Sequence, residues 1–306
     1  MLSWVRSGAL SVYERLIESE LSGAPSHVAV IQDGNRRYAD KEGADKEAGY
    51  EAGAQTTEQV LEWCDELGVE ELTLYTFSTE NFERPKADRE HLFDLITEKL
   101  YEFADAERVH EGEVSIRAIG ELERLPERVR EAVDYAESQT ADYDRLSLNI
   151  ALAYGGREEL LGAARSVCER VAAGDLDPDD IDVDTLDAEL GDSPTRDVDL
   201  IVRTGGDERT SNFLPWHANG NEAAAYFCTP YWPEFRKVDF LRAIRTYESR
   251  EASWRKTRAR RALALVQALS GMELPEARRV LGRFRDALPS GEREAAEDLD
   301  SEPSAD

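Results

Sequence analysis

The chain contains few cysteines and histidines, and it has no long apolar run. Its three cysteines, Cys64, Cys168 and Cys228, are odd in number and widely spaced, so we expect each to pack as a small apolar residue in a reducing cytoplasm. The four histidines do not cluster, and no zinc-binding spacing occurs. We also expect neither a secretory signal nor a membrane-spanning helix, because no apolar segment has the required length or flanks. Disulfide scaffolds and zinc modules are thereby excluded.

Lysine is also scarce, although the chain is strongly charged. The sequence has 65 acidic and 37 basic residues, which gives a formal net charge of −28, and only six of the basic residues are lysines. An acidic, lysine-poor surface stays soluble under heavy charge screening, so the composition favours a halophilic protein over an ordinary acidic one. No basic face or stripe is present, and we therefore expect no nucleic acid among the partners.

Apolar segments alternate between strand-like and helix-like patterns. The predicted strands are residues 28–31, 71–77, 114–119, 146–151 and 200–202, and the predicted helices are residues 47–67, 87–107, 126–139 and 157–173. This alternation predicts an α/β fold with a central, mostly parallel sheet flanked by helices on both faces. Residues 174–197 are rich in aspartate and predict a connection with one short helix. We expect a single catalytic domain over residues 25–288.

The two ends of the chain have different patterns. Residues 1–24 predict an amphipathic helix with apolar residues at helical spacing. Its acidic residues oppose strong binding to a membrane surface, so we favour packing against the body of the protein over a membrane-surface position. Residues 289–306 form an acidic tail without aromatic residues, which is typical of a disordered segment.

A first candidate site follows the strand at residues 28–31. The segment continues with Asp33, Gly34, Asn35, Arg36 and Arg37, which predicts a tight turn at the carboxyl end of the strand. Open α/β sheets bind their ligands at that end. Exposed amides beside two arginines suit a phosphate, and a carboxylate facing the phosphate suits a bridging Mg²⁺. An ordinary aspartate–glycine turn is the alternative if this segment is considered alone.

A second candidate site follows the strand at residues 200–202. Arg203, Gly205, Gly206, Arg209 and Ser211 bring together two guanidiniums, a hydroxyl and flexible backbone amides. This combination predicts a second anion-binding site. Two such sites at strand ends indicate an enzyme with two phosphorylated substrates.

The sequence resembles the cis-prenyltransferases, the undecaprenyl diphosphate synthase family, in five segments that occur in order. They are residues 27–38, 72–85, 148–157, 199–216 and 226–235, and they span roughly residues 25–250. The resemblance implies a central parallel sheet, a homodimer and a requirement for Mg²⁺. It also implies repeated condensation of isopentenyl diphosphate onto an allylic diphosphate with cis double bonds. The product would be a long polyprenyl diphosphate for a glycan-carrier lipid, with geranylgeranyl or farnesyl diphosphate as primer.

The resemblance also assigns roles to residues. Asp33 and Asn81 are expected to be catalytic, and Asp33 and Glu222 are expected to be associated with the metal. The expected substrate-binding residues are Gly34, Asn35, Arg36, Arg37, Tyr38, Lys46, Tyr50, Ser78, Arg84, Arg203, Arg209 and Ser211. The growing chain needs an apolar tunnel, and the helix at residues 87–107 suits its wall; plain core packing is the alternative for any single residue of that helix. A lipid product implies transient membrane contact of a cytoplasmic protein.

The chain departs from the family pattern at four of these positions. Tyr50 replaces a common histidine, Lys46 replaces a common arginine, and Arg36 occupies a position that is often glycine. The family's acidic residue shortly before its Tyr-Phe pair has no clean match, and Glu222 is the nearest carboxylate. Some members of the superfamily are non-catalytic partner subunits. We favour an active enzyme, because such subunits typically lack the aspartate that Asp33 matches.

Overall fold

The computed structural model describes residues 13–190, 194, 196–218 and 223–268, with side chains described through residue 252. The chain divides into two compact units, residues 1–244 and 245–306. The sheet and all predicted site residues belong to the first unit. The predicted domain end at residue 288 and the predicted tail at residues 289–306 lie outside the described residues.

Six strands form one sheet in the first unit. They are β1 His27–Ile31, β2 Glu71–Ser78, β3 Val114–Ile119, β4 Leu146–Tyr154, β5 Leu200–Arg203 and β6 Ala224–Phe227. The strand order is β3-β4-β2-β1-β5-β6, and all five pairings are parallel. The predicted α/β architecture is confirmed, although β6 was not predicted.

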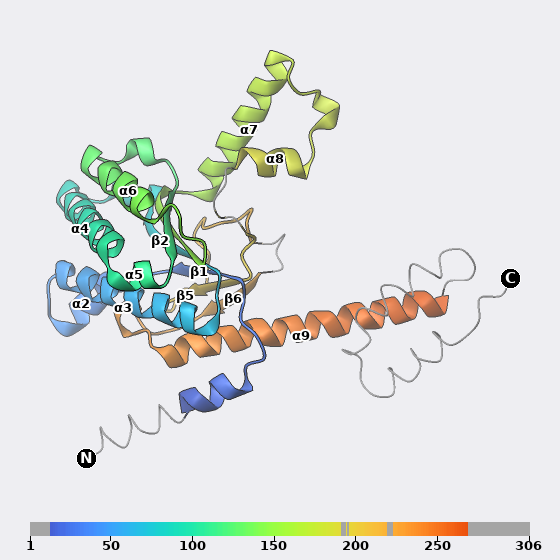
Figure 1. The fold of residues 1–306 in the computed structure, drawn as a ribbon, viewed down its shortest axis with the longest axis horizontal. Helices are drawn as coiled ribbons and strands as arrows, with labels where there is room; N and C mark the ends of the chain where they lie inside the picture. The colour runs from blue at the N-terminus through green and yellow to red at the C-terminus, as the bar shows by residue number, and fades with distance from the viewer. Residues whose placement is uncertain (1–12, 191–193, 195, 219–222, 269–306) are drawn as a thin grey trace. The chain divides into compact units, whose positions relative to one another are not determined.

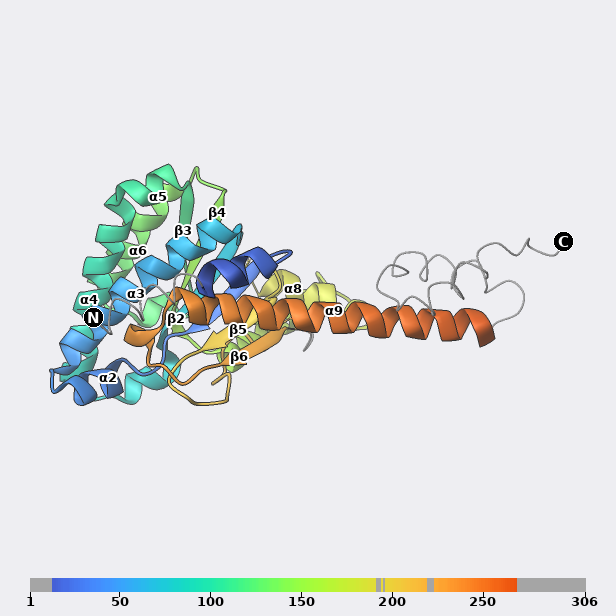
Figure 2. The same ribbon diagram turned by 90° about the horizontal axis from the view of Figure 1, so that it is seen from below.

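Helices lie on the chain segments between the strands and, in the case of α9, after β6 (Figure 1 and Figure 2). They are α2 Asn35–Glu42, α3 Lys46–Leu67, α4 Lys86–Asp105, α5 Glu107–Glu111, α6 Glu127–Thr140, α7 Gly156–Ala173, α8 Val183–Glu189 and α9 Lys237–Ala268. The four predicted helices agree with α3, α4, α6 and α7 to within a few residues, and α8 is the expected short helix. The prediction did not include α2, α5 or α9.

The core contains side chains from both faces of the sheet. Alternate residues of β1 point to opposite faces, so Ala29 and Ile31 join a cluster with Ile201, while Val28 and Val30 are buried on the other face. Cys64 and Cys228 are buried as predicted, but Cys168 is exposed on α7, which contradicts the expectation for that residue. The helical spacing of α7 turns this position toward solvent, because α7 buries only one narrow side.

The described part of the N-terminal segment packs against the body of the first unit. Residues 13–20 are helical, and Ile17 packs with Val238 and Leu241 of α9. Glu18 forms an ion pair with Lys237 at 2.7 Å. Residues 1–12 of the predicted helix lie outside the described residues. Across the part of the chain that the structure describes, no helix combines the length and apolar character needed to span a bilayer.

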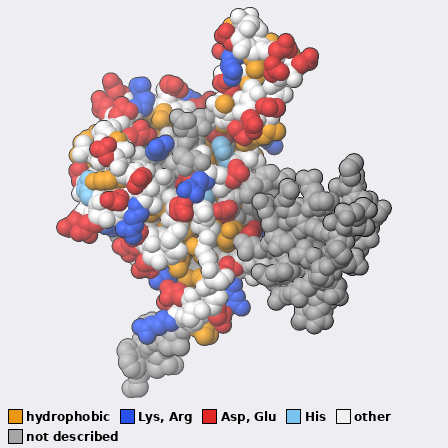
Figure 3. All heavy atoms as spheres, turned by 45° about the vertical axis from the view of Figure 1, so that its right-hand side comes forward, with side chains coloured by type: hydrophobic (Ala, Val, Ile, Leu, Met, Phe, Trp, Pro, Cys, Tyr) orange, Lys and Arg blue, Asp and Glu red, His pale blue; other side chains and the backbone are white. Residues whose placement is uncertain are grey.

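Carboxylates are spread across the surface in Figure 3, where arginines and lysines lie among them. Several of the basic side chains pair with two acidic ones. Arg128 contacts Glu90 and Asp94, and Lys237 contacts Glu18 and Glu66. Exposed pairs of this kind each contribute little to stability.

The topology creates a crevice at one edge of the sheet. β1 and β5 are neighbours, with Ile31 opposite Arg203. From β1 the chain leads to β2 on one side, and from β5 it leads to β6 on the other side. Connections that leave in opposite directions open a crevice beyond the carboxyl ends of the two strands. The two predicted anion-binding segments follow these two strands, so they meet at this crevice.

Candidate active site

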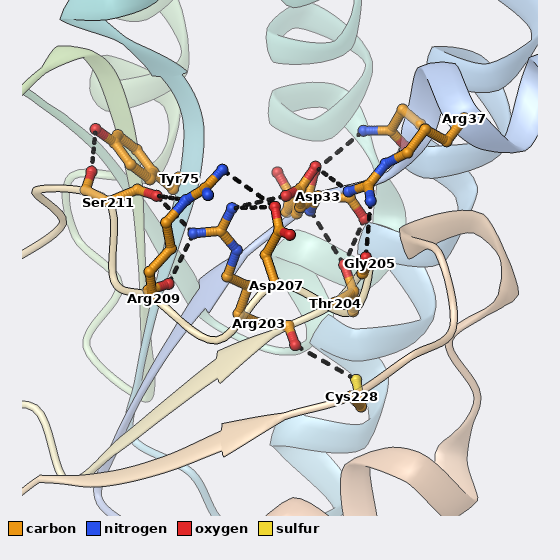
Figure 4. Close-up of polar contacts among 12 residues, drawn as sticks. Asp33, Arg37, Tyr75, Arg203, Thr204, Gly205, Asp207, Arg209, Ser211 and Cys228 are labelled. Atoms are coloured by element: carbon orange, nitrogen blue, oxygen red, sulfur yellow. Dashed lines mark hydrogen bonds and ion pairs between the residues drawn. The ribbon is translucent and has the colours of Figure 1, made fainter.

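Asp33 lies at the centre of the crevice and is bound from two sides by arginine (Figure 4). Its Oδ2 accepts a hydrogen bond from Arg203 Nη2 at 2.8 Å, and its Oδ1 lies 3.0 Å from Arg37 Nη2. The Thr204 hydroxyl donates to the backbone carbonyl of Asp33 at 2.7 Å. Burial raises the pKa of Asp33, but the Arg203 hydrogen bond and the Arg37 charge outweigh burial and hold this pKa below its usual value. Asp33 is therefore anionic at neutral pH.

Arg203 is the buried cation of the site, with its side chain only 4% exposed. Its Nη1 donates to the Arg209 carbonyl at 2.7 Å and to Ser211 Oγ at 2.5 Å. Its Nη2 contacts Asp33 and, at 3.3 Å, Asp207 Oδ2. Arg203 thus connects the segment after β1 with the segment after β5. The two predicted anion sites are parts of one continuous site.

Arg209 differs from Arg203 in its exposure to solvent, although the sequence predicted the same anion-binding role for both. The Arg209 side chain is 67% exposed, and its guanidinium contacts Asp207 Oδ2 at 3.1 Å and Ser211 Oγ at 3.3 Å. Ser211 itself has a left-handed backbone with φ of 49°, which is unusual for a serine and turns its hydroxyl toward both arginines. Arg209 is therefore free to turn toward an incoming anion, whereas Arg203 is fixed.

The glycines of the second segment do not supply the predicted anion-binding amides. Gly205 and Gly206 have φ values of 84° and 83°, and their N–H groups donate to the carbonyls of Pro230 and Cys228 at 2.8 and 2.9 Å. The Gly205 carbonyl accepts from Arg37 Nη1 at 2.9 Å. This expectation is wrong, because these amides already have partners within the protein. The glycines instead allow Arg37 to pass close to the backbone, since a Cβ on Gly205 would lie 2.6 Å from Arg37 Nη2.

The segment after β1 also differs from the prediction, because its backbone N–H groups belong to the start of a helix rather than to a simple turn. Gly34, with φ of 108°, is the N-cap of α2 and supplies no side-chain cap. The first N–H groups of a helix have no intrahelical acceptor, so this helix end attracts an anion. Gly49 and Gly53 of α3 allow α2 to pack closely, since a Cβ on either would lie within 2.4 Å of an oxygen of Asn35. The Asn35 Oδ1 atom is buried without a hydrogen-bond partner.

A third group of side chains comes from α3 and the segment after β2. Arg84 Nη1 donates to the Tyr50 hydroxyl at 3.1 Å, so the tyrosine that replaces the family histidine orients an arginine. Lys46 forms an ion pair with Asp88 at 2.9 Å. The Asn81 side-chain oxygen accepts from the backbone N–H of Ser78 at 3.3 Å, at the start of the 3₁₀ helix η1 Thr79–Glu83.

Two adjoining cavities meet at these residues. One has a volume of about 440 Å³ and is lined by Asp33, the start of α2, Lys46, Arg84 and Arg209. The other has a volume of about 400 Å³ and extends from Asp33 along α4, β2 and β4, where most of its wall is apolar. We call the first the polar cavity and the second the apolar cavity. The helix that was expected to form the tunnel wall, residues 87–107, corresponds to α4, and five apolar residues of α4 line the apolar cavity.

The structure brings most of the predicted residues to these cavities. The polar or the apolar cavity is lined by Asp33, Gly34, Asn35, Arg36, Arg37, Lys46, Tyr50, Ser78, Asn81, Arg84, Arg203, Arg209 and Ser211. Tyr38 lines neither cavity, and Glu222 lies outside the described residues. Asp207 lines the polar cavity and was missed. In the sequence, only its proximity to Arg203, four residues earlier, indicated that the two side chains could pair.

The arrangement suits a diphosphate attached to a hydrocarbon chain. Cations and helix amides surround the polar cavity, and the adjoining apolar cavity can bury the chain. Within the described residues, no group of three or more histidine, cysteine or acidic side chains could hold a metal ion. Mg²⁺ in proteins is commonly bound by one or two carboxylates together with water and substrate phosphates, so a single carboxylate such as Asp33 is compatible with such an ion.

Comparison with known proteins agrees with this chemistry. The Prenyltransf family model, which describes undecaprenyl diphosphate synthases, matches residues 31–255. A protein of Haloarcula marismortui is 69% identical over 294 residues, covering 96% of this chain and 97% of the relative. A protein of Halobacterium salinarum is 68% identical and covers 96% of each chain. Both are named tritrans,polycis-undecaprenyl-diphosphate synthase (geranylgeranyl-diphosphate specific).

Among solved structures, the chain is similar to lavandulyl diphosphate synthase from Lavandula x intermedia in complex with dimethylallyl diphosphate. The TM-score is 0.68 at 31% identity, covering 73% of this chain and 95% of that protein. The ligand of that structure combines a diphosphate with a short hydrocarbon chain, which is the chemistry that the two cavities favour.

Proposed function

Because this chain belongs to the undecaprenyl diphosphate synthase family of cis-prenyltransferases, we propose that it extends geranylgeranyl diphosphate with isopentenyl diphosphate. Each addition forms a cis double bond, and the product is a long polyprenyl diphosphate for a glycan-carrier lipid. The observation that carries the proposal is the polar cavity that opens at Asp33 onto the apolar cavity. The names of the haloarchaeal relatives support geranylgeranyl over farnesyl diphosphate as primer.

The allylic substrate has a charged head and a long tail, and the two cavities suit these two parts. We place its diphosphate in the polar cavity at the N-terminus of α2, where Arg36 and Arg37 add positive charge. Its tail then enters the apolar cavity along α4. This placement directs the reacting carbon to the junction of the cavities, where Asp33 lines both of them, and Asn81 lines the adjoining apolar cavity.

The isopentenyl diphosphate is placed at Arg209 and Ser211. The exposed guanidinium of Arg209 is the mobile ligand, and replacing its contact with Asp207 by a diphosphate gives charge-assisted hydrogen bonds. Arg203 acts beside it by holding Ser211 and Asp33 in position. Both diphosphates then share one crevice, with Arg203 between them.

The residues at Asp33 fit a Mg²⁺ ion that is completed by substrate oxygens. Asp33 is partly exposed to the polar cavity and anionic, and carboxylate oxygen is a ligand type that Mg²⁺ prefers. When bound, the ion would stabilise negative charge that develops on the departing diphosphate. The assignment of Glu222 as a second metal-associated carboxylate stays a prediction.

The chain's own residues supply the remaining stabilisation. As the allylic C–O bond breaks, its electron pair goes to the diphosphate, where Arg37, Arg84 and Lys46 face the increasing negative charge. The double bond of isopentenyl diphosphate then attacks the allylic carbon, which leaves the positive charge on the isopentenyl part. Loss of a proton from the carbon next to that charge, to the departed diphosphate or to water, restores a double bond. The apolar residues that line the cavity of the tail keep water from reaching the carbocation from that side.

We further propose that residues 25–288 form the catalytic domain and that the enzyme is a cytoplasmic homodimer. Release of a long lipid product favours transient contact with a membrane surface. A non-catalytic partner subunit is the alternative function, and the retention of Asp33, Asn35, Arg37, Arg203 and Arg209 argues against it.

Steady-state kinetics of three variants test the placement of the substrates. Arg37→Ala is expected to raise KM mainly for the allylic substrate, and Arg209→Ala mainly for isopentenyl diphosphate. Losing one charge-assisted hydrogen bond costs about 1.5–3 kcal/mol, or roughly tenfold or more in affinity. Lys86→Met is a matched control, because Lys86 is exposed and lines neither cavity. Equal effects of both arginine variants on both substrates would contradict the placement.

A further inference from the structure

Two glycines, Gly155 and Gly156, stand at the start of α7, directly after β4. A side chain at either position would collide with a neighbour. A Cβ on Gly155 would lie 2.3 Å from Glu158 Oε2, and a Cβ on Gly156 would lie 2.0 Å from Pro215 Cδ. As the N-cap residue, Gly155 also provides no side chain to accept from the first N–H groups of α7. The start of α7 is therefore open to close contact with the segment that follows β5.

Asn212 of that segment supplies the cap that α7 lacks. Its backbone carbonyl accepts from the N–H of Gly156 at 2.9 Å, and its Oδ1 accepts from the N–H of Arg157 at 2.9 Å. Its Nδ2 donates to Glu158 Oε2 at 3.1 Å. One residue thus binds three consecutive residues of α7 from a distant part of the chain. Asn212 is held through both its backbone and its side chain.

The residue before Asn212 is Ser211, whose hydroxyl contacts both Arg203 and Arg209. Ser211 and Asn212 have left-handed backbones, with φ values of 49° and 61°. Asparagine tolerates this conformation better than most residues, whereas serine adopts it rarely. Two such residues in succession persist only where the surrounding structure holds them. The contacts of Asn212 with α7 are placed to hold the conformation that turns the Ser211 hydroxyl toward the arginines.

A separate set of contacts attaches the same segment to the sheet. The Phe213 side chain is buried and stacks on Tyr75 of β2, with the ring centroids 4.4 Å apart. The Tyr75 hydroxyl also donates to the Ser211 carbonyl at 3.4 Å (Figure 4). None of these contacts uses the Asn212 side chain. Loss of that side chain should therefore leave the segment attached to the sheet and release only the orientation of its polar groups.

We propose that Asn212 is a positioning residue for isopentenyl diphosphate, because its contacts with α7 orient the Ser211 hydroxyl and, through it, the Arg209 guanidinium. The inference rests on the proposed function, which places this diphosphate at Arg209 and Ser211. Asn212 itself lines neither cavity. An exposed arginine loses conformational freedom when it binds an anion, and the contact of Arg209 Nε with Ser211 Oγ at 3.3 Å reduces that loss. Asn212 therefore acts on the affinity for one of the two substrates.

Steady-state kinetics of an Asn212 variant test the proposal. Asn212→Gly keeps a backbone that tolerates a positive φ and removes both side-chain contacts with α7. We expect KM for isopentenyl diphosphate to rise about tenfold, the effect of one lost charge-assisted hydrogen bond, and KM for the allylic substrate to stay unchanged. Glu158→Gln is a matched control, because its amide oxygen can still accept from Asn212, so neither KM should change.

An exchange of the two paired side chains adds a rescue test. Asn212→Asp retains the acceptor for the N–H of Arg157 but places a carboxylate against Glu158, so KM for isopentenyl diphosphate should rise. Adding Glu158→Gln supplies an amide N–H to the new carboxylate and should bring this KM back toward the wild-type value. General damage to the fold would not be repaired in this way. The exchange also keeps the proposal testable if Asn212→Gly fails to fold.

Val167→Ala controls for a general loss of stability in α7. Val167 is a buried residue of this helix, and its truncation should lower the melting temperature while both KM values stay at wild type. An unchanged KM for isopentenyl diphosphate in Asn212→Gly, or an equal rise of both KM values, would overturn the proposal. A double variant that binds no better than Asn212→Asp would also contradict it. Absence of isopentenyl incorporation by the wild-type protein would instead overturn the proposed function.

Discussion

Arg203 and Arg209 should respond very differently to replacement by alanine, although both follow β5. Arg203 donates four hydrogen bonds from a side chain that is 4% exposed, whereas Arg209 is 67% exposed. Breaking a buried ion pair by removing one partner costs about 3–5 kcal/mol. Asp33 retains some contact with water and with Arg37, so the lower end of that range, about 3 kcal/mol, is expected for Arg203→Ala.

For a compact unit of this size, about 3 kcal/mol lowers the melting temperature by roughly 6–12 °C. Arg209→Ala removes only exposed contacts, whose worth is about 0–1 kcal/mol, so its melting temperature should stay within a few degrees of wild type. Both variants should lose activity, since both arginines face the bound substrates. The melting temperatures of the two variants and of the wild type are measured by circular dichroism in high salt. Equal melting temperatures for the two variants would refute the account of Arg203 as the buried connection of the site.

Three further predictions concern Asp33 and salt. Asp33→Asn should reduce turnover to below about a tenth of wild type, a loss of more than about 1.4 kcal/mol, with secondary structure intact. The pKa of Asp33 is lowered in the folded state, so its stabilising contribution is present at neutral pH and lost as the pH falls below about 4. The stability difference between wild type and Asp33→Asn should therefore shrink in acid, and a constant difference would contradict this. Added KCl, from dilute buffer to molar concentration, should raise the melting temperature, because the Debye length falls from about 30 to about 3 Å; a flat or falling curve would exclude a halophilic surface.

Much of the fold followed from the sequence because the buried strands are short apolar runs with clear boundaries. The strands at β1 and β5 were predicted within one residue, and their carboxyl ends carry the site. The family was also predicted correctly, because five segments match in order. The parallel arrangement followed from the alternation of strands and helices, which leaves few other topologies.

The missed elements lack a local signal. The α2 segment has only two apolar residues, Tyr38 and Ala39, so no periodic face marks it as a helix. It packs closely against Gly49 and Gly53 of the next helix, a tertiary contact that its own residues do not indicate. β6 contains two alanines, which favour strands weakly, and it forms by pairing with β5.

The chemistry of the site was less predictable than its location. The amides of Gly205 and Gly206 looked available because their partners, Pro230 and Cys228, lie more than twenty residues away. The burial of Arg203 was likewise set by tertiary contacts with Asp33. A residue pattern indicates which groups meet at a strand end, but only the packing decides which of them already have partners.

The most direct test of the central claim is the product made by the purified protein alone. Wild-type protein is incubated in high KCl and Mg²⁺ with geranylgeranyl diphosphate and labelled isopentenyl diphosphate, and the products are analysed by mass spectrometry and by NMR of their double bonds. The account predicts a series of products that differ by five-carbon units and carry new cis double bonds. Farnesyl diphosphate should be used less efficiently. No incorporation without a second subunit, or trans double bonds in the added units, would contradict it.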